Sequence, residues 1–276
     1  MNPQFALGVV FYCTRIPDVE IILKTTSKLF NKSNIYIIDN SPNDYLRSIV
    51  LNFKVNYIHN PTNIGYGAAH NQAIEQSILN DVKYHLVLNP DINFEPKIIQ
   101  ELWEYMEENS DVGLVMPKVL NTDGSIQRLC KLLPSPFDLF FRRFAPDLFI
   151  TKQRNKKYEL ESFDYNKILN TPSLSGCFML IRTSVLKQVG LFDQRYFMYL
   201  EDYDLVRRIH KVSKTIFYPY VSVFHGHEKG SYKSVKLLFI HMISAVKYFN
   251  KWGWFFDEER ERFNKATLER LDHSNQ

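Results

Sequence analysis

Short apolar segments alternate with segments of helical periodicity along the first 116 residues, and this alternation constrains the fold more than any other feature. The apolar segments are residues 6–12, 35–38, 55–58, 84–88 and 112–116. The helical segments between them are residues 19–30, 44–51, 65–79 and 96–108. Strands that alternate with helices pair in parallel through right-handed crossovers. The sequence therefore predicts an α/β fold, Rossmann-like, with a mostly parallel mixed sheet flanked by helices.

The composition supports a globular protein and excludes several other classes. Of the 276 residues, 45% are hydrophobic and 23% are charged, with a net charge of +4, which suits a packed core rather than disorder. Cys13, Cys130 and Cys177 are widely spaced and include no CxxC pair, which argues against a disulfide framework or a zinc site. We expect no signal peptide, no transmembrane helix and no nucleic-acid partner, because the sequence lacks the corresponding patterns.

Three polar clusters directly follow predicted strands, at residues 39–41, 60–71 and 89–91. In a parallel sheet, ligands bind beyond the carboxyl ends of the strands, so these clusters predict one shared crevice. Asp39 could accept hydrogen bonds from a base or a ribose, or could cap the next helix. Asp91 could hold a divalent cation that bridges phosphates, since hard cations prefer oxygen ligands, or could be a turn residue.

The middle cluster places Gly65 and Gly67 where a strand turns into a helix. A phosphate could approach the backbone N–H groups there. The segment is neither a GxGxxG motif nor a Walker A loop. A glycine-rich helix entry that packs against the sheet is an equally good interpretation of these residues.

A second acidic group follows the apolar run at residues 196–200: Glu201, Asp202 and Asp204 fall within four positions. If a helix begins near Glu201, these carboxylates lie in its first turn, where the helix dipole favours negative charge. A carboxylate in that place beside apolar walls is a candidate general base. The alternative is an ordinary helix start, with the arginines at 207 and 208 as solvated partners.

The second half of the chain is less regular. Residues 132–150 are predicted as a long, partly apolar loop or a short helix, and residues 158–170 as polar and exposed. Residues 215–224 are rich in β-formers, with Pro219 at an edge or a break. His225 and His227 flank a glycine, which indicates a metal or phosphate contact, or else a solvent-facing loop.

Residues 234–271 have the pattern of helix, apolar on most sides, with lysines along it and a Trp/Phe cluster at 252–256. Lysine beside Trp and Phe is typical of helices that lie in a membrane interface. Docking of this helical region onto the rest of the protein is the alternative, with equal support.

Taken in order, several motifs resemble glycosyltransferase family 2, and most closely its rhamnosyltransferase-like branch in bacterial surface-polysaccharide synthesis, from about residue 7 to about residue 231. The motifs are Asp39-Asn40-Ser41, residues 63–71, Asn89-Pro90-Asp91, Ser175-Gly176, Phe192-Asp193 and residues 201–205. The resemblance implies a GT-A fold and an inverting transfer from a nucleotide-diphosphate sugar. It makes Asp202 the catalytic base.

The resemblance also implies a divalent cation, Mg²⁺ or Mn²⁺, held by Asp91, with His225 close to the metal and the diphosphate. Asp91 matches the last acid of the family's DxD motif, and Asn89 stands in place of the first acid, as in the rhamnosyl-like branch. Residues predicted to bind the nucleotide sugar are Thr14, Arg15, Asp39, Asn40, Asn63, Gly65, Gly67, Asn71, Asn89 and Asp91. Residues predicted to bind or orient the acceptor are Glu201, Asp204, Ser175 and Gly176, although Glu201 and Asp204 could instead hold the helix start.

By the same resemblance, we expect a catalytic domain at residues 1–231, with a nucleotide-sugar half at about 1–120 and an acceptor half at about 121–231. Residues 232–276 would form a helical appendage that contacts the membrane or another copy of the chain. The expected donor is dTDP-rhamnose, or else a UDP-hexose. The expected acceptor is a lipid-linked oligosaccharide, at the inner face of a bacterial membrane.

Two other functions are a binding protein for sugar nucleotides and a nucleotidyltransferase. A protein that binds sugar nucleotides without turnover needs no general base, so the presence of Asp202 argues against it. A nucleotidyltransferase would carry a glycine-rich loop with Lys or Arg after the first strand, where this chain has residues 12–17, Tyr-Cys-Thr-Arg-Ile-Pro.

Overall fold

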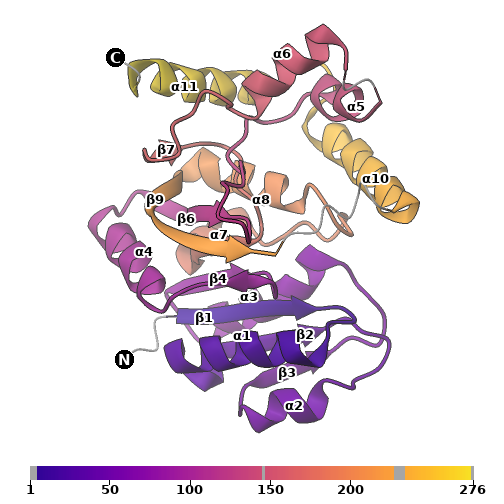
Figure 1. Ribbon diagram of the computed structural model, residues 1–276, viewed down its shortest axis with the longest axis vertical. Coiled ribbons are helices and arrows are strands. Elements are labelled where there is room, and N and C mark those ends of the chain that lie inside the picture. Colours follow the sequence, from indigo (N-terminus) through magenta and orange to yellow (C-terminus); the bar gives the residue numbers. More distant parts are fainter. Residues whose placement is uncertain (1–4, 145–146, 227–233, 275–276) are drawn as a thin grey trace.

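The structure is a computed structural model that describes residues 5–144, 147–226 and 234–274. One mixed sheet runs through the molecule in the order β3-β2-β1-β4-β8-β6-β9-β5, and β7 also pairs with β9 (Figure 1). The strands are β1 (Phe5–Phe11), β2 (Ile35–Asp39), β3 (Asn56–His59), β4 (Tyr84–Leu88), β5 (Ile92–Asn93), β6 (Val112–Leu120), β7 (Leu169–Asn170), β8 (Phe178–Arg182) and β9 (Lys214–His225). Strands β3, β2, β1 and β4 are parallel, β8 runs antiparallel between β4 and β6, and β6 and β9 are again parallel.

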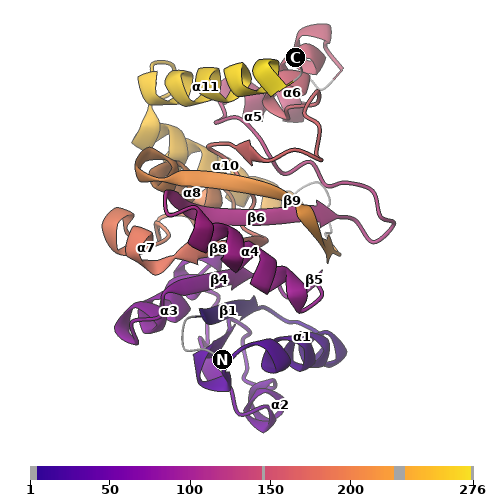
Figure 2. The same cartoon turned by 90° about the vertical axis from the view of Figure 1, so that its left-hand side faces the viewer.

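Helices cover both faces of this sheet. They are α1 (Ile16–Leu29), α2 (Arg47–Asn52), α3 (Tyr66–Leu79), α4 (Lys97–Glu108), α5 (Pro136–Phe144), α6 (Phe149–Tyr158), α7 (Thr183–Val189), α8 (Glu201–Val212), α10 (Val235–Trp252) and α11 (Glu258–Ser274), with a 3₁₀ turn at Lys32–Asn34. The buried residues of α1 and α4 form one core layer, and those of α3, α7 and α8 belong to layers on the opposite face. Figure 2 shows α3 and α7 on one side of the sheet and α1 on the other. The predicted mostly parallel mixed sheet between helices is confirmed.

The strand residues explain how the two layers form. Successive side chains of a strand point to opposite faces, so Leu7, Val9 and Phe11 of β1 enter the layer with α1, while Ala6 enters the layer with α3. Gly8 faces α3 closely, because a Cβ there would lie 2.9 Å from the Cβ of Ala73. The small residues of α3 therefore let this helix lie directly on the sheet.

Pro219 lies where the ladder between β6 and β9 shifts its register. Tyr218 pairs with Pro117, and the next pair joins Ser222 to Lys118, so residues 219–221 form a bulge opposite one peptide step. Proline lacks a backbone N–H and cannot donate to the ladder. The predicted break at Pro219 is confirmed.

One expectation for the second half is confirmed in its helical alternative, and another needs correction. Residues 132–150 include the short helix α5 and the start of α6, so the alternative of a long loop is excluded. Residues 158–170 are not generally exposed, since the apolar side chains within them are buried: Tyr158, Leu160, Phe163, Tyr165 and Leu169. Phe163 and Tyr165 pack edge-on against Phe217 of β9 at ring distances of 5.7 and 5.1 Å. Polar residues lie between these aromatic residues in the sequence, so the average composition of the segment indicated an exposed region.

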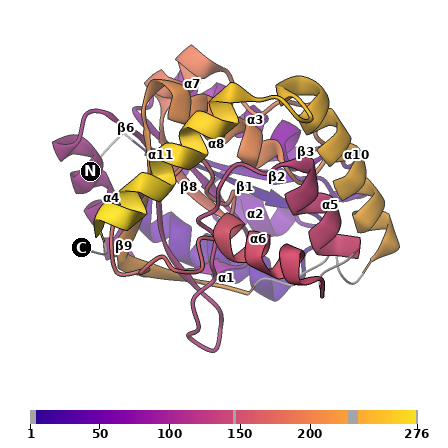
Figure 3. The ribbon, with the colours of Figure 1, turned by 90° about the horizontal axis from the view of Figure 1, so that it is seen from above.

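The C-terminal region forms two helices rather than one. Gly253 breaks the helical run with a φ of 99°, a conformation that favours glycine. Figure 3 shows α11 crossing over the sheet at the end of the molecule where α5, α6 and α10 also lie. Among the described residues, no helix is both long and apolar enough to cross a bilayer.

Candidate active site

Helix α8 begins directly after two residues in the left-handed backbone region, Tyr199 (φ 71°) and Leu200 (φ 66°). Neither is a glycine, and such strain persists only where surrounding contacts impose it, often at functional sites. Glu201 and Asp202 are the first two residues of the helix. The strained turn therefore sets the direction of both carboxylates, as the acidic motif predicted for a helix start.

The Asp202 carboxylate is held by backbone donors. Its Oδ2 accepts a hydrogen bond from the N–H of Gly176 at 3.1 Å, and its Oδ1 accepts one from its neighbour Tyr203 at 2.9 Å. A Cβ at position 176 would lie 3.3 Å from the Cβ of Asp202, so a glycine allows the backbone to approach this closely. The predicted Ser-Gly and acidic motifs thus meet, although 26 residues separate Gly176 from Asp202.

Burial raises the pKa of Asp202, and the hydrogen bond from Gly176 partly offsets that effect. Burial also raises the pKa of Glu201 well above its usual range, and the nearby charge of Asp202 acts in the same direction. The Glu201 Oε2 is buried without a hydrogen-bond partner among the described residues. The geometry therefore favours a neutral Glu201 beside an Asp202 that can exchange a proton.

A tyrosine connects the base to the metal motif. The hydroxyl of Tyr66, at the start of α3, lies 2.8 Å from the backbone carbonyl of Gly176 and 3.0 Å from the Oδ1 of Asn89, and these two acceptors share its single proton. The amide nitrogen of Asn89 lies 3.4 Å from the Nε2 of His225. Polar contacts thus run from Asp202 through Gly176, Tyr66 and Asn89 to the histidine at the end of β9.

His225 and Asp91 face one another at this end of the sheet. The Nε2 of His225 lies 3.3 Å from the Oδ1 of Asp91, and the carboxylate of Asp91 is partly exposed. The backbone N–H of Gly226 donates to the carbonyl of Asp91 at 3.1 Å, which joins the two segments. Strand β5 pairs with the end of β9 and sets this register, with Ile92 opposite His225.

Gln127 determines which ring nitrogen of His225 carries the proton. Its Nε2 donates to the backbone carbonyl of His225 at 3.0 Å, so its Oε1 is the atom 3.0 Å from the Nδ1 of the ring. A carbonyl oxygen can only accept, and Nδ1 must therefore donate. In the neutral imidazole, the lone pair then lies on Nε2, which faces Asp91 and Asn89.

On the nucleotide side, the loops after β2 and β3 are tied together by amides. The Nδ2 of Asn40 donates to the Oδ1 of Asn63 at 3.2 Å and to the carbonyl of Gly65 at 3.3 Å. The Oδ1 of Asn63 also accepts from the N–H of Gly65 at 2.9 Å. These predicted nucleotide-binding residues are therefore neighbours, and part of their hydrogen-bonding capacity shapes the loop.

Asp39 ends β2 as a fully buried carboxylate. Its Oδ1 accepts from the N–H of Ser41 at 2.9 Å and its Oδ2 from the hydroxyl of Tyr57 at 2.8 Å. The N–H–to–Oδ1 contact two residues on is the geometry of a turn. Asp39 does not cap the next helix, because the N-cap of α2 is Leu46 and has no side-chain cap bond. Contact of Asp39 with a base or a ribose stays a prediction.

The glycine-rich entry to α3 packs against the segment before α8. Gly65 has a φ of 95°, and a Cβ there would lie 2.4 Å from the carbonyl oxygen of Phe197. A Cβ at Gly67 would lie 2.8 Å from that of Phe192. Asn71 is buried and its amide bonds to both the N–H and the carbonyl of Phe192. These contacts give all three a packing role, and a direct contact of Gly67 or Asn71 with a nucleotide sugar stays a prediction.

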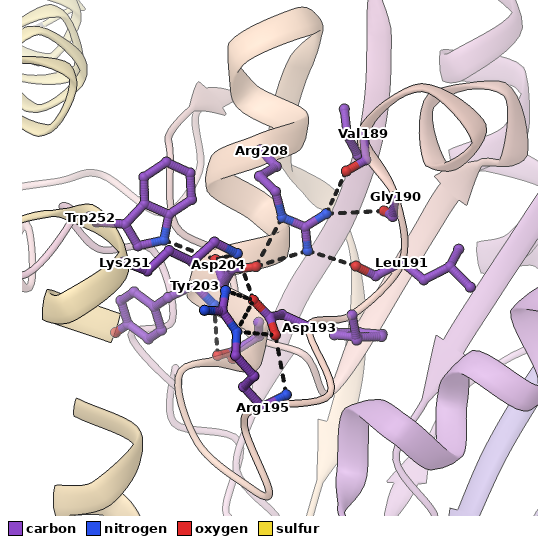
Figure 4. Close-up of polar contacts among 12 residues, drawn as sticks. Val189, Gly190, Leu191, Asp193, Arg195, Tyr203, Asp204, Arg208, Lys251 and Trp252 are labelled. Carbon is purple, nitrogen blue, oxygen red and sulfur yellow. Dashed lines mark hydrogen bonds and ion pairs between the residues drawn. The ribbon is translucent and has the colours of Figure 1, made fainter. Parts of the chain in front are cut away.

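Asp204 belongs to a charged network that joins α8 to the end of α10 (Figure 4). Its Oδ2 lies 2.9 Å from Arg208, and its Oδ1 accepts from the indole N–H of Trp252 at 2.9 Å and pairs with Lys251 at 2.5 Å. Arg208 also donates to the carbonyls of residues 189–191. These contacts match the alternative in which Asp204 holds the helix start.

Three other predicted residues lie on loops with local contacts. The backbone carbonyl of Thr14 accepts from the hydroxyl of Tyr45 at 2.6 Å, and the exposed side chain of Arg15 pairs with Asp18 at 2.8 Å. The hydroxyl of Ser175 accepts from the N–H of Cys177 at 3.4 Å. Their roles toward ligands stay predictions. His227 and the rest of residues 227–233 lie outside the described residues.

Sequence reasoning missed two residues that organise the site, Tyr66 and Gln127. Tyr66 lies inside the motif at residues 63–71, between Gly65 and Gly67. A hydroxyl side chain between two glycines was the feature that could have indicated its role. Gln127 follows a turn at 121–125 and no local pattern marks it. Both act through contacts with residues about 100 positions away in the sequence.

The fold defines the class of protein. The crystal structure of GalNAc-T7 with UDP, GalNAc and Mn²⁺ superimposes with a TM-score of 0.59 at 14% identity, over 88% of this chain and 47% of that chain. This architecture is the GT-A fold of glycosyltransferases. Residues 13–190 match the family model of glycosyl transferase family 2, so the chain belongs to that family and is a glycosyltransferase.

Two curated relatives share part of the sequence. An N-acetylglucosaminyl-diphospho-decaprenol L-rhamnosyltransferase of Mycobacterium tuberculosis is 29% identical over 179 residues, which is 61% of this chain and 58% of that protein. The low-salt glycan biosynthesis hexosyltransferase Agl10 of Haloferax volcanii is 26% identical over 207 residues, 71% of this chain and 62% of that protein. The chain thus spans less than two thirds of the length of each.

Proposed function

We propose that this glycosyltransferase is an inverting enzyme that moves a sugar from a nucleotide-diphosphate sugar to a hydroxyl group of a lipid-linked oligosaccharide. The observation that carries the proposal is the polar connection from Asp202 to the pair of Asp91 and His225. It supports Asp202 as the base and Asp91 with His225 as the diphosphate side of one site. An inverting displacement requires these two functions on opposite faces of the transferred sugar.

In this mechanism, Asp202 accepts the proton of the acceptor hydroxyl as that oxygen attacks the anomeric carbon. The N–H of Gly176 orients the carboxylate and stabilises its charged form. Burial raises the pKa of Asp202 and so increases its basicity relative to a solvated aspartate. Glu201, buried and neutral beside it, leaves Asp202 as the carboxylate that changes charge.

Asp91 and His225 fit a divalent cation. A carboxylate oxygen and an imidazole lone pair converge at 3.3 Å, and Gln127 fixes the ring tautomer in the way that outer hydrogen bonds fix metal-bound histidines. Among the described residues, no three His, Cys, Asp or Glu side chains group together, so the remaining ligands would come from the diphosphate and water. When bound, Mg²⁺ or Mn²⁺ would neutralise charge on the diphosphate. The Mn²⁺ in GalNAc-T7 supports this assignment.

The donor is dTDP-rhamnose in the first place and a UDP-hexose in the second. The name of the mycobacterial relative supports rhamnose and a polyprenyl-diphosphate acceptor, and that of the haloarchaeal relative supports a hexose. A lipid-linked acceptor is embedded in a membrane, so the enzyme must reach it at the membrane surface. We therefore propose a peripheral location at the inner face of the membrane. Residues 1–231 would carry catalysis and residues 232–276 would form the appendage.

The test is transfer by Asp202→Asn, with dTDP-rhamnose and UDP-hexoses offered in turn to a lipid-diphosphate saccharide. Loss of the base should lower turnover by about 10²-fold or more, and NMR of the wild-type product should show an inverted anomeric configuration. Asp81→Asn is the matched control, because Asp81 is an exposed aspartate just beyond the C-terminal end of α3 and should keep full activity. Near-normal turnover of a folded Asp202→Asn protein would refute the assignment.

A further inference from the structure

Helix α10 has fully buried side chains over its C-terminal half only. Its buried residues are Ser244, Ala245, Tyr248 and Phe249, and none of residues 235–243 is buried. Seven of these nine residues are apolar: Val235, Leu237, Leu238, Phe239, Ile240, Met242 and Ile243. The side chains of Phe239 and Ile243 are 61% and 52% exposed. Figure 1 shows the helix at the rim of the molecule, with its start farthest from the other helices.

The Trp/Phe cluster that was expected to contact the membrane includes a tryptophan that instead packs within the protein. The ring of Trp252 lies 4.0 Å from the guanidinium of Arg207 and its N–H binds Asp204, so this tryptophan serves docking. In the N-terminal half of α10, His241 contacts Tyr199, while Phe239 and Ile243 are exposed. Monomeric proteins rarely leave a continuous apolar patch of this kind without a partner. A second apolar tip lies at the start of α6, where Phe149 and Ile150 are exposed, and α5 contacts both α6 and α10.

Charge identifies the partner. Residues 235–252 contain no acidic residue and three lysines, of which Lys236 lies in the exposed half and Lys251 pairs with Asp193 and Asp204. Residues 136–158, which include α5 and α6, contain six basic residues and two acidic residues. Apolar residues among lysines and arginines match the surface of an anionic lipid leaflet. A second copy of the chain would bring the same positive surface against itself in a two-fold dimer, where like charges repel.

The exposed half of α10 also lies beside the catalytic turn. The ring of His241 packs at a tilt against that of Tyr199, with 4.9 Å between ring centres, and the hydroxyl of Ser244 donates to the carbonyl of Met198 at 2.8 Å. Tyr199 is three residues before Asp202. A leaflet that receives this helix therefore approaches the side of the molecule where α8 begins.

We propose that residues 235–243 of α10, together with the tip of α6 at residues 148–150, enter an anionic lipid leaflet and bring the lipid-linked acceptor to Asp202. This inference rests on the proposed function for the identity of the acceptor. The lipid-binding surface is inferred independently, from the exposure of its residues, their charge and the contact with Tyr199. The C-terminal half of α10 keeps the inserted half in a fixed position relative to the base.

The test is co-sedimentation with phosphatidylcholine vesicles that contain phosphatidylglycerol, at low and high salt. Wild-type protein should bind, and more weakly at high salt. Phe239→Ser/Ile243→Ser should bind at least about tenfold more weakly, because it removes two exposed apolar anchors. Ile21→Ser/Leu79→Ser removes two exposed apolar residues elsewhere and should bind like the wild type. Both side chains at 239 and 243 are exposed, so the variant should keep its melting temperature.

Three results would overturn the inference. They are wild-type protein that does not bind these vesicles, equal binding by the Phe239→Ser/Ile243→Ser variant, and light scattering that shows a wild-type dimer which this variant converts to a monomer. Transfer to a water-soluble acceptor separates the two proposals. If both proteins transfer the sugar equally to that acceptor while neither binds vesicles, the proposed function stands and the lipid surface does not.

Discussion

Asp204→Asn is the substitution that best tests how the catalytic helix is held. The carboxylate of Asp204 is fully buried and meets two cations, Arg208 at 2.9 Å and Lys251 at 2.5 Å, together with the indole N–H of Trp252 (Figure 4). Lys251 also pairs with Asp193 at 2.8 Å. One side chain thus joins the first turn of α8 to the end of α10 and, through Arg208, to the carbonyls that follow α7.

The size of the effect follows from burial. Removing one partner of a buried ion pair costs about 3–5 kcal/mol, since the other charge loses its compensation. Asparagine keeps an acceptor oxygen for Trp252, and Lys251 and Arg208 are 21% and 16% exposed, so water and Asp193 compensate part of the loss. We therefore expect about 3 kcal/mol, which lowers the melting temperature by about 6–12 °C in a chain of this size.

The assay is urea and thermal unfolding of Asp204→Asn, Lys251→Met and the double variant. The two single losses should add to more than the double loss, because both remove the same contact. Glu269→Gln is the control, since its pair with Lys265 is solvent-exposed and should change stability by less than about 0.5 kcal/mol. A free energy of unfolding for Asp204→Asn that stays within this control range would show that the network does not support α8.

Two further outcomes are expected. Burial raises the pKa of Glu201 well above its usual range, so the folded protein binds this proton more tightly than the unfolded chain, and stability falls as the pH rises from about 4.5 through the folded-state pKa. Glu201→Gln should remove that slope and be more stable than the wild type at neutral pH in urea unfolding; equal slopes would contradict this. Gln127→Leu frees the Nδ1 of His225 and should raise the Mn²⁺ concentration for half-maximal transfer about 10- to 100-fold; an unchanged Mn²⁺ titration would dismiss the tautomer argument.

The strand and helix pattern of the first half was predictable because it depends on local properties. Continuous apolar runs indicated buried strands, and turn residues followed them, so the sheet and the edge where Asp91 lies could be inferred. The acidic motif at Glu201 and Asp202 indicated a helix start for the same reason. Only the pair of positive-φ residues before it was unexpected, since nothing in Tyr199 or Leu200 favours that conformation.

The packed second half was much less predictable. Residues 158–170 look polar in sequence, yet Phe163 and Tyr165 are buried against β9. The helical pattern of residues 234–271 was confirmed, but which part docks depends on Trp252 and its contact with Arg207. Amphipathicity describes a face and does not specify the surface that will cover it.

By itself, the sequence determined the α/β alternation, the helix start at Glu201 and the family to which the chain belongs, because apolar periodicity and short polar motifs are local signals. Only the tertiary structure decided that Asp202 meets Gly176, that Gln127 sets the tautomer of His225, and that Asp204 pairs with Arg208 and Lys251. These contacts join residues that lie on different elements. Their geometry depends on how the helices pack on the sheet, which no short segment of the chain encodes.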